Sequence, residues 1–140
     1  MALAIKTVRD GLATILRNGM VGDPNIARKL YGYRTLPTDV RRGIAISYTG
    51  GRVVSDAAWA AERYFTIILT ASHDKSEADL KAAEDDLITM TDKVESLLRT
   101  YRRSDYWLDI EFRQPSIYPD TEKGNRGVRM AWIPIIIKSR

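Results

Sequence analysis

The chain has 140 residues, of which 44% are hydrophobic and 29% are charged, and its formal net charge is +4. This length fits one domain over residues 1–140, and the composition is that of a globular protein, outside the range typical of disordered chains. Cysteine is absent, which excludes disulfides, thiolate nucleophiles and cysteine-based zinc or iron–sulfur sites.

An amphipathic helix is the first predicted element. Apolar residues fall on one face, and Asn18-Gly19 is a pair suited to closing a helix; these apolar residues are Ile5, Val8, Leu12, Ile15 and Leu16. Charged residues interrupt the segment, so it lacks the continuous apolar region of a secretory signal. The longest apolar stretch, residues 130–137, is far shorter than the ~20 residues of a membrane-spanning helix. We therefore expect a protein that stays in the cytoplasm and has no membrane partner.

Residues 20–42 show no sustained hydrophobic period and contain Gly22, Pro24, Gly32 and Pro37. We predict a long loop here, within which residues 24–30 could form a short helix. A β-hairpin should follow, because residues 43–49 and 52–55 are β-prone and flank Gly50-Gly51. Residues 56–62 fit a helical turn as well as a continued strand.

A β-α-β-β unit makes up the rest of the chain. Residues 64–71 are β-branched and aromatic throughout, which is typical of a central strand. A long helix is predicted over residues 76–103, where apolar residues recur at steps of three and four; this seam is formed by Leu80, Ala83, Leu87, Met90, Val94, Leu97 and Tyr101. The fold class is therefore α+β, with the long helix and the N-terminal helix packed on a mixed, mainly antiparallel sheet.

Two more strands close this unit. In residues 106–113 the alternation predicts a buried face with Ile110 and a wet face with Trp107. Residues 128–138 contain Pro134, which cannot donate to a ladder and indicates an edge strand or a bulge. Residues 114–127, between the two strands, contain two prolines and two glycines and are predicted to project as a loop.

Catalytic chemistry finds little support in the sequence. Ser72, His73 and Asp74 contain the residue types of a triad, but neighbours in sequence seldom reach triad geometry. We interpret them as a polar loop in which Asp74 or Ser76 caps the long helix, with Asp79 completing a capping box. The acidic run 84–86 is interpreted as a solvated helix face. We predict no catalytic residue, metal or cofactor, although His73 with nearby carboxylates leaves a Mg²⁺ or Ca²⁺ site open.

Aromatic and basic residues in the irregular segments are the best candidates for contacts. Residues 1–63 hold ten Lys/Arg and five Asp/Glu, so positive charge is concentrated in the first half of the chain. Such residues suit nucleic acid through stacking and phosphate contact, or a neighbouring subunit, and we favour the subunit. The candidate interface residues are Tyr31, Tyr33, Arg34, Arg41 and Arg42 in the first long loop, and Tyr118 and Arg126 in the second.

The order of elements resembles that of the tail terminator (tail completion) proteins of long-tailed bacteriophages. The resemblance covers most of the chain and rests on its architecture; it is carried by residues 5–16, 64–69, 76–103, 106–112 and 128–137. It implies a virion structural protein at the head–tail junction, assembled in the host cytoplasm. Such a subunit forms a hexameric ring that caps the tail tube, stops its polymerisation and provides the surface for head joining.

The implied partners are other copies of the chain, the tail tube protein and the head–tail connector protein, with DNA meeting the ring only as it passes through. Two alternatives stay open. A head–tail connector or head completion protein would look much alike, and a DNA-associated assembly factor belongs to the same alternative. A small hydrolase or nuclease is the less favoured alternative.

Overall fold

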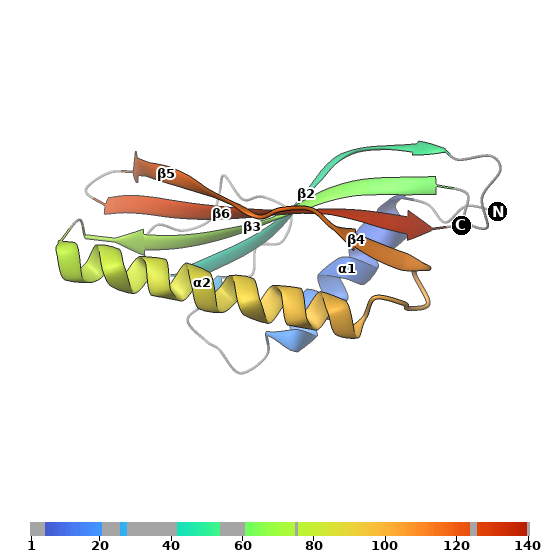
Figure 1. The fold of residues 1–140 in the computed structure, drawn as a ribbon, viewed down its shortest axis with the longest axis horizontal. Helices are drawn as coiled ribbons and strands as arrows, with labels where there is room; N and C mark the ends of the chain where they lie inside the picture. Colours follow the sequence, from blue (N-terminus) through green and yellow to red (C-terminus); the bar gives the residue numbers. More distant parts are fainter. Residues whose placement is uncertain are drawn as a thin grey trace.

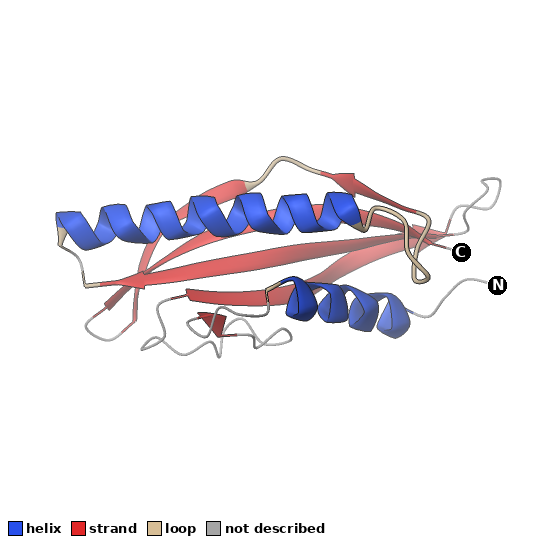
Figure 2. Ribbon diagram, turned by 90° about the horizontal axis from the view of Figure 1, so that it is seen from below, coloured by secondary structure: helices blue, strands red, loops and turns tan. Residues whose placement is uncertain are grey.

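Two helices lie on one face of a twisted six-stranded sheet in the computed structural model of the chain (Figure 1). Figure 2 views the molecule from the helix side, where the long helix and the shorter one both lie in front of the strands. The predicted α+β class, with two helices on a mainly antiparallel sheet, is therefore confirmed.

The structure describes residues 5–20, 26–27, 42–53, 61–74, 76–123 and 126–139. In chain order the elements are α1 (Ile5–Gly19), β1 (Ile26–Ala27), β2 (Arg42–Val53), β3 (Ala61–His73), α2 (Glu77–Thr100), β4 (Asp109–Phe112), β5 (Ser116–Lys123) and β6 (Arg126–Ser139). Because Ile26 and Ala27 form a strand, the alternative of a short helix over residues 24–30 is wrong. Most of the predicted loop over residues 20–42 lies outside the described residues.

The strand order is β1-β2-β3-β6-β4, and β5 also pairs with β6. Among the described strands, only the short β1 is parallel to its neighbour. β3 is a central strand, as predicted, because it pairs along its length with β2 on one side and β6 on the other. β6 is also internal, so its interpretation as an edge strand is wrong: β3 covers one side of it, and β4 and β5 share the other.

β2 is one long strand, and the predicted hairpin at Gly50-Gly51 is wrong. The register against β3 shifts between Tyr48 and Gly50, so Thr49 is an extra residue and the strand carries a β-bulge. Gly50 has a φ of +138°, a conformation that other residues rarely adopt. The glycine that suggested a turn therefore serves a bulge, and β2 continues to Val53 opposite Ala61.

β4 and β5 follow the same side of β6 with an interruption between them. Phe112 pairs with Ile135, and Ser116 pairs with Trp132. The three residues 113–115 therefore lie opposite the two residues 133 and 134, so one residue is extra. At this point the Arg113 N–H donates to the Pro134 carbonyl oxygen at 3.0 Å. A residue's N–H and C=O point to the same side of a strand, so the proline nitrogen, which cannot donate, faces the interruption. Pro134 thus marks a bulge, one of its two predicted meanings.

β5 replaces the projecting loop that was predicted over residues 114–127. It pairs antiparallel with β6, and Lys123 pairs with Arg126 at the end of the ladder. This prediction failed because prolines and glycines were interpreted as loop signals, whereas an edge strand tolerates proline on its unpaired side.

The core lies between the helices and the sheet. Every second residue along β3 and along β6 faces the helices. These residues are buried in the core and include Phe65, Ile67, Ile133 and Ile135. Within the predicted seam of α2, Ala83, Leu87, Met90 and Val94 are buried. Leu98 completes the seam in place of Leu97. Leu97 is half-buried and packs against Gly19 of α1. Tyr101, the last residue of the predicted seam, is exposed.

Ser76 caps α2 as predicted, but Asp79 does not complete a capping box, because the Ser76 N–H donates to Asp74 Oδ1 at 3.0 Å. Ser76 Oγ accepts from the Asp79 N–H at 3.2 Å, and Asp79 Oδ2 accepts from the Asp74 N–H at 2.7 Å. Ser72 and His73, however, are the last residues of β3 and are buried, so they do not belong to a polar loop.

Trp107 corrects the prediction for the following segment. It precedes β4, is only 3% exposed, and donates from Nε1 to the Tyr101 carbonyl oxygen at 2.9 Å. The strand pattern starting at residue 106 placed this ring on the wet face. Since β4 begins only at Asp109, the alternation does not extend back to Trp107.

Candidate interaction surfaces

The predicted contact residues do not form one site among the described residues. Arg42 is half-buried at the start of β2, while Tyr118 lies in β5 and Arg126 begins β6, on the other side of β3. The remaining candidates, Tyr31, Tyr33, Arg34 and Arg41, lie outside the described residues. Their role in contacts therefore stays a prediction.

The sheet has a helix face, which packs on α1 and α2, and an opposite face over which no described helix lies (Figures 1 and 2). We call the second the helix-free face. Alternation along the strands places on it the side chains of Ser47, Arg52, Glu62, Tyr64, Thr66, Glu111, Ser116, Pro134 and Ile136.

A trough of ≈ 360 Å³ crosses the strands on this face. Its lining includes Tyr64 and Thr66 from β3 and Pro134 and Ile136 from β6, with Thr49 of the β2 bulge and Arg113 of the β4–β5 interruption also lining it. Bulges bend a strand and increase its local twist. The β2 bulge and the β4–β5 interruption both lie beside the trough. The local bending and twisting that they cause explain why the sheet is hollowed there.

Ion pairs flank the trough. Arg52 pairs with Glu62, whose side chain is 7% exposed, and Arg113 Nη2 lies 3.4 Å from Glu111 Oε2. A buried carboxylate needs such a partner, because leaving its charge unpaired would be costly. Each pair consists of one arginine and one glutamate, so the helix-free face carries both positive and negative charges.

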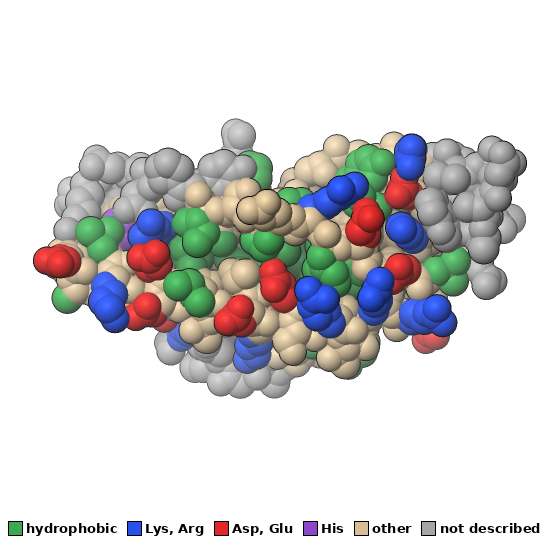
Figure 3. Space-filling model, in the orientation of Figure 1, with side chains coloured by type: hydrophobic (Ala, Val, Ile, Leu, Met, Phe, Trp, Pro, Cys, Tyr) green, Lys and Arg blue, Asp and Glu red, His purple; other side chains and the backbone are tan. Residues whose placement is uncertain are grey.

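Asp109 and Arg102 form a third ion pair, with Arg102 Nε 2.6 Å from Asp109 Oδ1. Burial raises the pKa of the Asp109 carboxyl, but the hydrogen bond from Arg102, the Ile110 N–H and the charges of Arg102 and Lys138 outweigh burial. Its pKa therefore lies below the ordinary value, and the pair joins the end of α2 to β4. Figure 3 shows the mixed band of charge over this end of the molecule.

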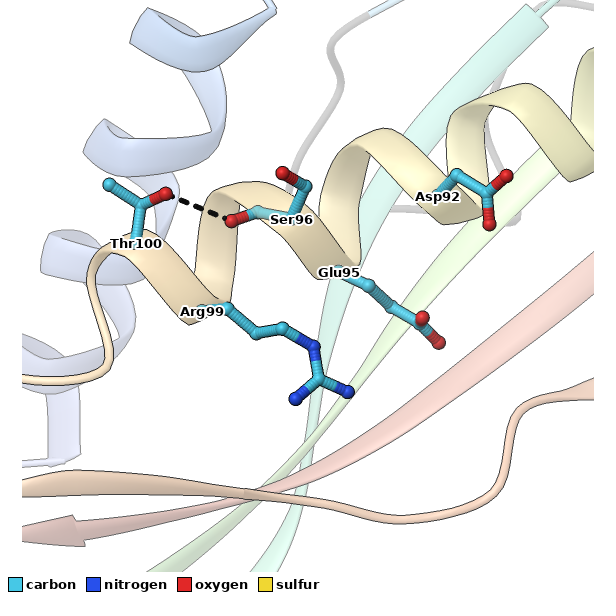
Figure 4. Close-up of a pocket in the computed structure, with 5 residues that line it drawn as sticks. All are labelled: Asp92, Glu95, Ser96, Arg99 and Thr100. Atoms are coloured by element: carbon cyan, nitrogen blue, oxygen red, sulfur yellow. Dashed lines mark hydrogen bonds between the residues drawn. The ribbon is translucent and has the colours of Figure 1, made fainter.

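A second hollow, of ≈ 490 Å³, lies along the flank of α2. Its lining residues are Asp92, Glu95, Ser96, Arg99 and Thr100, and Figure 4 shows Glu95 and Arg99 extending from the helix on one side. The Arg99 guanidinium lies 4.6 Å from the centre of the Phe112 ring, a cation–π contact with β4. This contact explains the position of Arg99 as part of the packing of α2 on the sheet.

The two sides of the sheet are open edges in the part of the chain that the structure describes. β1 pairs with β2 only at Arg42 and Gly43, so β2 has no described partner on that side from Ile44 to Val53. On the opposite side, β4 and β5 pair only with β6. Unpaired N–H and C=O groups at such edges are templates for strand addition.

The described residues offer little to catalysis or to a metal. No group of three or more His, Asp or Glu side chains in the described ranges is placed to hold a metal ion. His73 is buried at the end of β3 against Gly127. None of the described helices is long and apolar enough to cross a membrane.

No protein-family model matches the chain, and no curated protein matches it. A function for this protein is therefore inferred from the geometry of these surfaces.

Sequence reasoning missed these surfaces. It placed the joining edge on β6, whereas the open edges belong to β2 and to β4 with β5. One signal was present: from Ile44 to Gly51 the sequence of β2 contains neither a charged residue nor a proline, the usual protections of an edge.

Proposed function

We propose that the protein is a structural subunit of a virion, the tail terminator of a long-tailed bacteriophage. Copies of the chain would close into a ring, six in the family that it resembles, cap the tail tube and stop its polymerisation. The upper face of the ring would then receive the head connector.

The observation that carries this proposal is a sheet that has, among the described residues, helices on one face and an open edge on each side. A folded subunit with two different open edges has the geometry of a part that joins its own kind head to tail, and such joining closes into a ring when the rotation per subunit allows. The order of elements, with a helix, three strands of which the first is short, a long helix and three closing strands, supports the same family.

Polymerisation of purified tail tube protein tests the proposal. Added terminator should bind tube ends and end elongation, so tube length should become uniform and fall as its concentration rises. Tubes that grow to the same lengths with and without the protein would overturn the capping function. If the protein instead bound DNA with a steep salt dependence and ignored tubes, the DNA-associated alternative would replace it.

The basic residues of the first half supply a second test. Arg34→Glu and Arg41→Glu should weaken ring formation or docking on the tube, since charges at a contact surface set complementarity between partners. Arg42 is unsuitable for this experiment, because it is half-buried in β2 and its reversal would also disturb the sheet. Normal capping by the Arg34→Glu and Arg41→Glu variants would remove these residues from the contact surface.

A further inference from the structure

We propose that neighbouring copies of this chain join through their sheets, with β2 of one copy pairing antiparallel with β4 and β5 of the next. This inference rests on the proposed ring and assigns the strands that would form its subunit contact.

The strand directions permit this join without turning a subunit over. β2, β3, β6 and the β4–β5 pair alternate in direction across the sheet, so the two open edges run in opposite senses. A second copy placed beside the first in the same orientation therefore brings its β2 antiparallel to β4 and β5. Each copy then uses both edges once, which is the arrangement of a head-to-tail ring.

The irregularities of the two edges match. Ser47 and Arg52 are five residues apart in β2, yet both lie on the helix-free face because Thr49 is extra. Glu111 and Ser116 are also five apart and on that face, because one residue is extra at the β4–β5 interruption. When the bulge faces the interruption, Ser47 lies opposite Ser116 and Arg52 opposite Glu111. Side chains of both strands then keep to the same faces along the whole join.

Charges agree with this register on the helix-free face. Arg52 already pairs with Glu62 within its subunit, and Glu111 pairs with Arg113 within its own. The join would place these pairs in one row, Glu62, Arg52, Glu111 and Arg113, in which neighbours have opposite signs. Opposite charges on facing strands stabilise a sheet, and like charges destabilise it.

Apolar side chains agree with it on the helix face. The same register sets Ile46 opposite Ile117, and Tyr48 opposite Pro115, which has no N–H to donate at that point of the join. Tyr48 and Ile117 are large hydrophobic residues that are 42% and 51% exposed in the subunit, at its two opposite edges. Pairing would bring Tyr48 of one copy and Ile117 of the next onto the same face as diagonal neighbours across the join. Part of their apolar surface would then be removed from water.

The ends of the join are also consistent. β1 occupies the edge of β2 at Arg42 and Gly43. In the proposed register Tyr118 lies opposite Ala45, and the register of β5 against β6 shifts just beyond Tyr118. Regular pairing of β5 would therefore end where β1 begins.

Disulfide trapping tests the join, and the absence of cysteine makes the experiment clean. The double variant Ser47→Cys with Ser116→Cys should give a ladder of covalent multimers after mild oxidation, and a reductant should remove it. Neither single variant should form covalent dimers, while a mixture of the two should. The matched control, Ser47→Cys with Ser96→Cys on the exposed side of α2, should form no ladder.

A second pair of variants tests the same contact without a covalent bond. Tyr48→Lys places a charge on the β2 edge and should shift the protein to monomers while its circular dichroism stays unchanged. Ile88→Lys is the control, because Ile88 is 47% exposed in the middle of α2 and belongs to neither strand edge. It should assemble as the wild type does.

The outcomes separate this inference from the proposed function. A wild-type ring without a ladder in the double variant, or with covalent dimers from Ser47→Cys alone, would overturn the edge pairing and leave the ring in place. A wild-type protein that stays monomeric alone and with tubes would overturn both.

Discussion

The imidazole of His73 lies directly against Gly127, its cross-strand partner at the end of β3 and β6. A Cβ added to Gly127 would overlap the ring, and the His73 side chain is buried. The only histidine of the chain thus occupies space that the opposite glycine leaves free.

Replacing Gly127 with alanine should therefore lower the free energy of unfolding by about 1–3 kcal/mol, because the new methyl group overpacks a filled site. In a His73→Ala background the same substitution should cost far less. A double-mutant cycle by urea denaturation measures this coupling. Equal costs of Gly127→Ala in the two backgrounds would show that the ring does not fill this space.

Leu87→Ala should lower the free energy of unfolding by about 2–5 kcal/mol, because Leu87 is fully buried in the seam of α2 and its loss leaves a cavity. Ile88→Ala is the control on the next residue of the helix, where the side chain is 47% exposed, and should cost about 0.5 kcal/mol or less. Chemical denaturation of both variants decides the assignment of the seam. Similar losses for the two would contradict it.

Asp109→Asn should destabilise the protein at neutral pH and have little effect in acid. The pKa of Asp109 is lowered in the folded state, so its carboxylate stabilises the fold above the pKa of the unfolded chain. This stabilisation is lost as the pH falls through the lowered folded-state pKa. Unfolding curves from pH 7 downward, expected to converge for the variant and the wild type, provide the measurement. Asp105→Asn, at an exposed position, is the control, and a constant difference between Asp109→Asn and wild type at every pH would contradict the role of the pair.

Periodicity predicted the helices and the central strand well. The apolar spacing of α1 and α2 arises because one stripe of each helix must be buried, and the structure buries that stripe. β3 was recognisable because apolar, β-branched residues on both faces are typical of an internal strand. Ser76 and Asp79 identified the start of α2 by the chemistry of capping.

The errors about the hairpin, the edge strand and the projecting loop have one physical origin, which is that glycine and proline mark special backbone geometry without indicating which kind. Gly50 needs a positive φ in a turn and in a bulge alike, so the sequence could not separate the two. Pro134 lacks an N–H wherever it lies, and only the pairing with the neighbouring strands shows that its nitrogen needs no partner there. The open edges of the sheet, and with them the candidate surfaces, follow from that pairing and could not be predicted before it.

Mass measurement in solution, for the wild-type protein alone and with purified tail tubes, tests the central claim most directly. The ring proposal predicts a single closed assembly of identical subunits, in free solution or on the tube end, whose mass is a fixed multiple of the 15.9 kDa chain and does not grow with concentration. A protein that keeps the mass of one chain under both conditions would contradict the account.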